Sequence, residues 1–204
     1  MSRLVSRAVL WLLDQTHIVV TGITALAFLK TRSAHVGYFI SGAVLFNTFA
    51  KLSKNIIRQD RPNVTVEDDP KDPSRRPKKK VKKTYGMPST HSTSIGFYMA
   101  YIILSLPPFS SPSTTISGMR RASTVSGPTG GLMALVTLVW GSLIMWSRVR
   151  IGYHTLAQVL VGATIGLSGG VAWRWMWDHK VVGLGSWEGV LQGWIDRAFG
   201  IVGL

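Results

Sequence analysis

The chain has 204 residues, of which 46% are hydrophobic, and it contains no cysteine, which excludes disulfide bonds and thiolate metal sites. Lys and Arg number 23 against 9 Asp and Glu, a net charge of +14, and such an excess favours an anionic partner: nucleic acid, anionic lipid or phosphate. Nucleic acid is not expected, because the basic residues alternate with long apolar blocks and match no nucleic-acid-binding motif.

The apolar residues fall into about five blocks, with nearly all charged residues between them. A membrane-spanning helix needs roughly 20 mostly apolar residues; the last block meets this requirement, and the middle three do so only with their flanks. Small residues inside the blocks suit close helix packing in lipid. We therefore predict an all-α fold, a polytopic membrane helical bundle of about five transmembrane helices with amphipathic surface helices, rather than a soluble bundle. The blocks are residues 10–28, 36–50, 94–106, 132–146 and 156–177.

Residues 1–30 combine a basic start with an apolar stretch that is interrupted by polar residues at 14–17. This pattern predicts an interfacial helix followed by a span. The start lacks a clear small-residue cleavage site, so we expect it to belong to the mature protein. The second block is predicted to continue as a helix through Lys51, Lys54 and Arg58, whose spacing of three and four residues puts them on one face.

Pro62 is expected to end that helix, and residues 63–85 after it are the most polar part of the chain. An acidic cluster at 67–69 is followed by eight Lys and Arg between Lys71 and Lys83. Such a run predicts a solvated, mobile loop, with attraction to anionic lipid head groups as its functional alternative. The excess of Lys and Arg favours a cytosolic position for this loop.

The remaining segments complete a single membrane-embedded domain with a core at about 36–177. Residues 110–129 are rich in Ser, Thr, Gly and Pro, which predicts a flexible connector. The tail, residues 181–204, spaces its apolar residues at helical intervals and predicts an amphipathic surface helix. The histidines at 17, 35 and 179 are expected at the surface or the membrane interface.

Three polar stretches at the boundaries of the apolar blocks are candidates for one site: residues 54–62, 88–91 and 147–158. If all five blocks span, alternation places residues 54–91 and 148–154 on the same side of the membrane. Charged and titratable residues next to lipid are costly unless they bind an anion or face water. We therefore interpret these stretches together as one site that handles phosphate.

The cations of this candidate site suit phosphoryl transfer, which needs charge neutralisation on the phosphate oxygens. Lys54, Arg61 and Arg148 can supply it, and the planar fork of arginine binds two oxygens at once. Ser89 and Thr90, at a predicted helix start, can donate further hydrogen bonds together with the first backbone N–H groups.

Two histidines provide the proton and the nucleophile that the same reaction needs. Of His91 and His154, one can attack phosphorus while the other protonates the leaving group. Gln158 lies four residues after His154, on the same face if this segment is helical, and its carbonyl can accept the proton of one ring nitrogen. The only carboxylate near these motifs is Asp60, so we expect neither a metal nor another cofactor.

These motifs resemble those of the type 2 phosphatidic acid phosphatase superfamily, which are membrane lipid phosphatases. The matching segments are Lys54-(six residues)-Arg61-Pro62, Pro88-Ser89-Thr90-His91 and Ser147-Arg148-(five residues)-His154. The resemblance implies that His154 is a nucleophile forming a phosphohistidine and that His91 is the general acid. It also implies that phosphate is bound by Lys54, Arg61, Ser89, Thr90 and Arg148.

The sequence departs from the family pattern at two positions. Thr90 stands where Gly is common, and Gln158 stands where Asp usually activates the nucleophile. Residues 86–92 and 153–159 are nevertheless similar to the dolichyl diphosphate phosphatase branch, in which Gln at this place is familiar.

That branch implies removal of one phosphate from a polyprenyl (dolichyl) diphosphate at the endoplasmic reticulum membrane, with a lumenal site. The lumenal site conflicts with the cytosolic loop that the basic residues favour. Two alternatives stay open: a phosphatase for another lipid phosphate (phosphatidate, a sphingoid base phosphate or a short isoprenoid diphosphate), and a non-catalytic protein that binds or transports phospholipid. The sequence does not specify an oligomeric state.

Overall fold

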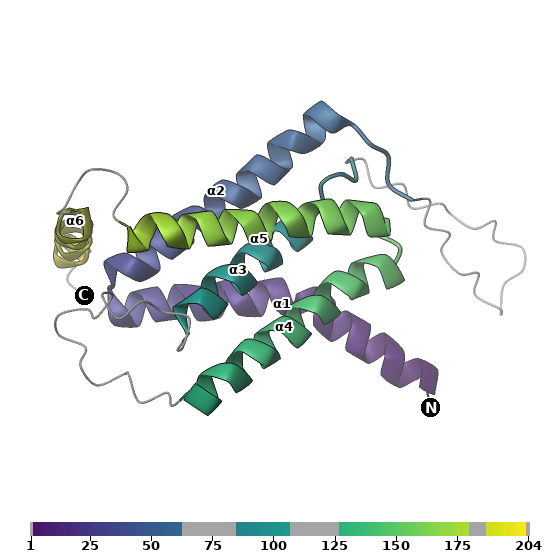
Figure 1. The fold of residues 1–204 in the computed structure, drawn as a ribbon, viewed down its shortest axis with the longest axis horizontal. Helices are drawn as coiled ribbons and strands as arrows, with labels where there is room; N and C mark the ends of the chain where they lie inside the picture. Colours follow the sequence, from purple (N-terminus) through teal and green to yellow (C-terminus); the bar gives the residue numbers. More distant parts are fainter. Residues whose placement is uncertain (1, 63–84, 107–126, 180–186, 203–204) are drawn as a thin grey trace, which may run out of the picture.

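The protein is described from a computed structural model, which covers residues 2–62, 85–106, 127–179 and 187–202. All regular secondary structure in these ranges is α-helical, so the all-α prediction is confirmed. The predicted polar loop lies almost wholly outside the described residues, as does most of the predicted connector. The helices are α1 (Ser2–Thr31), α2 (Ala34–Ile57), α3 (Thr90–Ser105), α4 (Gly127–Arg150), α5 (Leu156–Asp178) and α6 (Trp187–Val202) (Figure 1).

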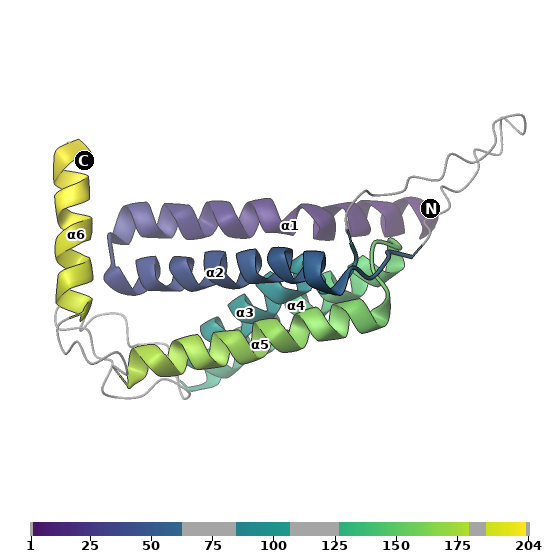
Figure 2. The same cartoon turned by 90° about the horizontal axis from the view of Figure 1, so that it is seen from above.

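Helices α1 to α5 run between the two ends of an elongated bundle in alternating directions (Figures 1 and 2). The alternation brings the end of α2, the start of α3 and the turn between α4 and α5 to one end of the bundle. Helix α6 lies across the opposite end, as expected of a surface helix. It is held there by Gln192, which accepts from the Ala34 N–H at 2.9 Å and donates to the Arg32 carbonyl at 2.8 Å.

The first two helices differ from the sequence prediction in their limits. Helix α1 is one continuous helix of 30 residues, so its polar residues do not divide it. Helix α2 ends at Ile57, because Arg58 takes a left-handed conformation with φ 49°. The Arg58 N–H donates to the Lys54 carbonyl at 3.0 Å. The helix therefore ends before Pro62, and Arg58 leaves the face that carries Lys51 and Lys54.

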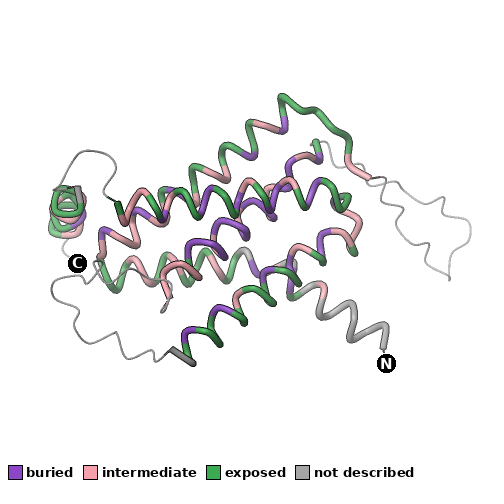
Figure 3. The backbone as a smooth tube through the Cα atoms, in the orientation of Figure 1, coloured by how far each residue is buried: buried purple, intermediate pink, exposed green. Residues whose placement is uncertain are grey.

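The distribution of side chains in the described residues is unusual for a soluble protein. Large apolar side chains are exposed along the outer faces of the helices, whereas several polar and charged side chains are buried inside. Figure 3 shows the buried positions concentrated on α3 and along α5. Two helices in the described ranges are long and apolar enough to cross a membrane, Thr129–Arg150 and Leu156–Asp178. These observations indicate a membrane protein; the count of about five spans remains a prediction.

Helix α3 packs most closely against α5, and glycines on α5 permit the approach. Gly162, Gly166 and Gly170 recur every fourth residue and face the backbone of α3. A Cβ atom at Gly162 would lie 2.6 Å from the Ser89 carbonyl oxygen, and one at Gly166 would overlap the carbonyl oxygen of Thr93. Small residues at this spacing let helix backbones come together in lipid, and here they set the position of the start of α3 against α5.

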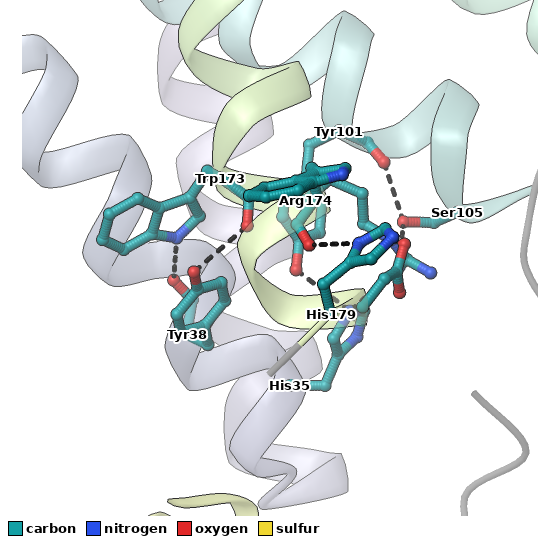
Figure 4. Close-up of polar contacts among 9 residues, drawn as sticks. His35, Tyr38, Tyr101, Ser105, Trp173, Arg174 and His179 are labelled. Atoms are coloured by element: carbon teal, nitrogen blue, oxygen red, sulfur yellow. Dashed lines mark hydrogen bonds and ion pairs between the residues drawn. The ribbon is translucent and has the colours of Figure 1, made fainter. Parts of the chain in front are cut away.

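A partly buried polar cluster connects three helices at the end of the bundle near α6 (Figure 4). Arg174 on α5 donates to Ser105 Oγ and pairs with Asp178 Oδ2, each at 2.9 Å. The Nε2 atom of His35 lies 3.2 Å from Arg174 Nη1 and 3.0 Å from the hydroxyl of Tyr101. His35 was expected at the surface or interface. It instead lies on α2 and packs against α3 and α5, where its Nε2 accepts from the buried guanidinium of Arg174.

We expect Gly166→Ala to lower the unfolding temperature in detergent, because its methyl group has to displace the α3 backbone, a strain of about 1–3 kcal/mol. Gly22→Ala is the matched control, since a Cβ atom there meets nothing within 4 Å, and it should leave the unfolding temperature unchanged or raise it slightly. Equal unfolding temperatures for the two variants would contradict the close α3–α5 contact.

Candidate active site

The turn between α4 and α5 places His154 at the end of the bundle. The carbonyl of Arg148 accepts from the N–H groups of Tyr153 at 3.1 Å and His154 at 3.3 Å, so the chain folds back on the last turn of α4. Gly152 has φ 80° in this reversal, a conformation that favours glycine. The motif histidine is therefore held by backbone hydrogen bonds and not by a flexible loop.

Gln158 contacts His154 as the sequence suggested, but for a different reason. Helix α5 begins at Leu156, so His154 precedes the helix and the two residues do not share a helix face. Thr155 is the N-cap, and Gln158 folds back to it in a capping box: Thr155 Oγ1 accepts from the Gln158 N–H at 3.3 Å, and Gln158 Oε1 accepts from the Thr155 N–H at 3.2 Å. The same Oε1 atom lies 3.2 Å from His154 Nδ1.

Three neighbours fix the orientation of the Gln158 amide. Its Nε2 donates to the Asp60 carbonyl at 2.9 Å and to Gln59 Oε1 at 3.1 Å, while its Oε1 accepts from the Thr155 N–H. A backbone carbonyl only accepts and a backbone N–H only donates, so the amide cannot be reversed. Since Oε1 is an acceptor, this contact favours the tautomer in which His154 Nδ1 carries the proton.

Backbone contacts join the remaining segments to this network. The Gly86 N–H donates to the Gln59 carbonyl at 2.7 Å, and the Ser89 N–H donates to the Gln158 carbonyl at 3.1 Å. A Cβ atom at Gly86 would lie 2.7 Å from Gln158 Cδ, so only glycine allows the chain to pass this close to the amide. The sequence did not indicate these roles of Gln59, Asp60 and Gly86, because they depend largely on backbone atoms and on contacts between segments far apart in the chain.

The surroundings of His154 keep its ring neutral. The residue is 4% exposed, and its Nε2 lies 3.5 Å from Nη1 of Arg61. Burial, and then the charges of Arg61 and Lys54, lower the pKa of His154 to about 4. At neutral pH the ring is therefore unprotonated, and its Nε2 lies beside the guanidinium of Arg61.

The three predicted cations are at least half-buried at this end. Lys54 is 8% exposed and Arg148 is 2% exposed. Arg61 Nη1 donates to the Tyr153 carbonyl at 3.3 Å, and burial lowers its pKa. Arg148 donates from Nη2 to the Leu13 carbonyl of α1 at 3.4 Å. Buried positive charge of this kind favours an anionic ligand.

The start of α3 separates the roles of its three predicted site residues. Ser89 is fully buried, and its Oγ is the N-cap that accepts from Ser92 N–H at 3.4 Å and from Ser92 Oγ at 3.0 Å. The Ser89 hydroxyl thus holds the first turn of α3, and its binding of phosphate stays a prediction. Thr90 and His91 are half-buried and line a cavity between α1, α2 and α3 that adjoins this turn.

Comparison with known proteins finds a family model and several relatives that match most of the chain. The model of the PAP2 superfamily matches residues 34–181. Lipid phosphate phosphatase epsilon 1, chloroplastic, of Arabidopsis thaliana is 29% identical over 139 residues, which are 68% of this chain and 39% of that protein. Dolichyldiphosphatase 1 of Homo sapiens is 29% identical over 155 residues, 76% of this chain and 58% of its own length. Dolichyldiphosphatase of Saccharomyces cerevisiae (strain ATCC 204508 / S288c) is 27% identical over 164 residues, covering 78% and 59% of the two chains.

The chain thus spans about two fifths of the plant relative and under two thirds of the two dolichyldiphosphatases. No solved structure matches it significantly. All three motif segments lie within the residues that the family model covers.

We expect Arg61→Met to raise the pKa of His154, because the variant removes the larger of the two charges that oppose protonation of the ring. On acidification, the His154 ring of the variant would therefore become protonated at a higher pH than the ring of the wild type. NMR titration of the ring, with Arg150→Met as the control for an exposed cation at the same end, measures the shift. A His154 pKa that is unchanged or lower in Arg61→Met would contradict this electrostatic coupling.

Proposed function

The chain belongs to the PAP2 superfamily, and we propose that it hydrolyses a lipid phosphate or diphosphate at the membrane through a phosphohistidine on His154. The observation that carries the proposal is the geometry of His154. Its ring is neutral, its Nδ1 proton is held by Gln158, and its Nε2 lone pair faces Arg61. A phosphoryl group bound by the cations would meet that lone pair directly.

In the first step, His154 Nε2 attacks phosphorus and the bond from phosphorus to the leaving oxygen breaks. Lys54, Arg61 and Arg148 neutralise the non-bridging oxygens, whose charge must be stabilised in the transition state. His91 gives its proton to the leaving oxygen. The products are a phosphohistidine, a neutral His91 and the released lipid.

In the second step, water attacks the phosphohistidine, and His91 takes the proton from the water as the N–P bond breaks. Inorganic phosphate leaves, and both histidines return to their starting states. The cations perform the neutralisation for which many phosphatases use a divalent ion, so the reaction is proposed to be independent of metal.

The substrate we propose is a polyprenyl diphosphate such as dolichyl diphosphate, hydrolysed at the endoplasmic reticulum membrane with a lumenal site. Residues 86–92 and 153–159 support this choice, because they resemble the dolichyl diphosphate phosphatase branch and hold the glycine, glutamine and histidine of the network described above. Several relatives carry the name dolichyldiphosphatase. A phosphatase for another lipid phosphate is the second candidate, favoured by the similarity to the plant lipid phosphate phosphatase.

We expect His154→Ala to abolish turnover, because no phosphohistidine can form. His91→Ala should slow the release of an alcohol leaving group severely and the release of a phosphate leaving group less, since the latter needs less protonation. Assays with a lipid monophosphate and a lipid diphosphate in detergent and excess chelator measure both. Equal residual activity of the two variants on both substrates, or loss of wild-type activity in chelator with rescue by magnesium, would contradict the mechanism.

Gln158→Ala should lower kcat by roughly 10–100-fold, the scale of losing a partner that orients a reactive histidine, with little change in KM. Gln158→Glu should not restore it fully, because one carboxylate oxygen would face the Asp60 carbonyl and Gln59 Oε1, which Gln158 Nε2 now binds as a donor. Ser168→Ala, at an exposed position of α5, is the control. Full activity of Gln158→Ala would show that another acceptor orients His154.

A further inference from the structure

A cavity of about 470 Å³ lies between α1, α2 and α3, next to the candidate active site. Thr90 and His91 of α3 line it together with Lys51 and Asn47 of α2. Apolar residues from all three helices line the rest, among them Ile40 and Tyr98. The cavity therefore shares His91 with the catalytic machinery.

The lining changes from charged to apolar along the bundle. Ile40, Asn47 and Lys51 follow one face of α2, and at 1.5 Å per residue they cover about 16 Å along the helix axis. Lys51 lies one turn before Lys54, whose charge acts on His154. Lys51, Asn47 and His91 thus mark the end of the cavity at the active site, and Ile40 lies deeper in the bundle.

A diphosphate lipid matches this order of groups. His154 attacks the outer phosphorus, so the leaving group is the lipid with its inner phosphate, which must lie beside the acid His91. Lys51 and Asn47 line the same cavity as His91, and an ammonium group and a side-chain amide can both donate to phosphate oxygens. The apolar part of the cavity can then take the hydrocarbon chain that follows the inner phosphate.

We propose that Lys51, with Asn47, binds the phosphate that remains on the lipid and so makes the enzyme prefer diphosphates to monophosphates. The proposal rests on the function proposed above and deepens it. A lipid monophosphate leaves as an alcohol and places no phosphate beside Lys51. Removing Lys51 should therefore affect one substrate class and spare the other, which a cation that only reaches toward solvent or head groups would not do.

The test compares a prenyl diphosphate with the prenyl monophosphate of the same chain, farnesyl diphosphate and farnesyl monophosphate, using the full chain in detergent. We expect Lys51→Met to lower kcat/KM for the diphosphate by about 10–100-fold, the scale of one lost charge-assisted hydrogen bond, and to change the monophosphate value less than about twofold. Lys51→Arg should retain most of the preference, and Asn47→Leu should lose a smaller part. Arg150→Met, an exposed cation at the same end, should leave both values unchanged.

Each result decides the proposal. If Lys51→Met lowers both kcat/KM values equally, or lowers neither, Lys51 has no role in distinguishing the substrates and the proposal is wrong. The proposed function would still stand in that case, provided that wild type hydrolyses the substrates and His154→Ala does not. Retained hydrolysis of the monophosphate also shows that the variant is folded. If wild type hydrolyses neither substrate, the proposed function fails, and this inference fails with it.

Discussion

The side-chain amide of Gln158 is the contact on which the rest of the site depends. Its oxygen accepts from the Thr155 N–H and lies 3.2 Å from His154 Nδ1, and its nitrogen donates to the Asp60 carbonyl. One residue thus starts α5, holds the segment after α2 and selects the tautomer of the histidine. A carboxylate in its place could orient the ring and would add a negative charge beside it; the amide orients the ring without charge, which suits a buried histidine that must stay neutral.

The bundle supplies the precision that this network needs. Glycines on α5 bring α3 close enough for the Ser89 N–H to bond the Gln158 carbonyl, so the start of α3 is positioned by the same residue that orients His154. Alternation of helix direction brings α2, α3 and the α4–α5 turn to one end. At the other end, Arg174 and His35 tie α2, α3 and α5 together, which limits how far the helices can shift relative to one another.

The positions of the helix ends and the grouping of the motif segments could be predicted from the sequence, because both depend on the pattern of charged and apolar residues. Charged motifs at the boundaries of apolar blocks predicted helix ends, and alternation predicted that the motifs meet. The sequence pattern could not predict contacts that are made through backbone atoms or between segments far apart in the chain. The left-handed Arg58, the carbonyl of Asp60 and the close approach of Gly86 leave no periodic signal. Gln158 was expected to reach His154 along a helix face and does so through a capping box. The Ser89 hydroxyl caps α3, a role that the motif did not indicate.

The proposed reaction requires that His154 is neutral at physiological pH, with its proton on Nδ1 and its lone pair on Nε2. ¹⁵N NMR of the ring nitrogens of His154, in protein labelled on histidine and assigned against His154→Ala, measures this directly. We expect that at pH 7 Nδ1 shows a directly bonded proton and Nε2 does not, and that the ring gains a second proton only near pH 4. A proton on Nε2, or an imidazolium ring at pH 7, would contradict it.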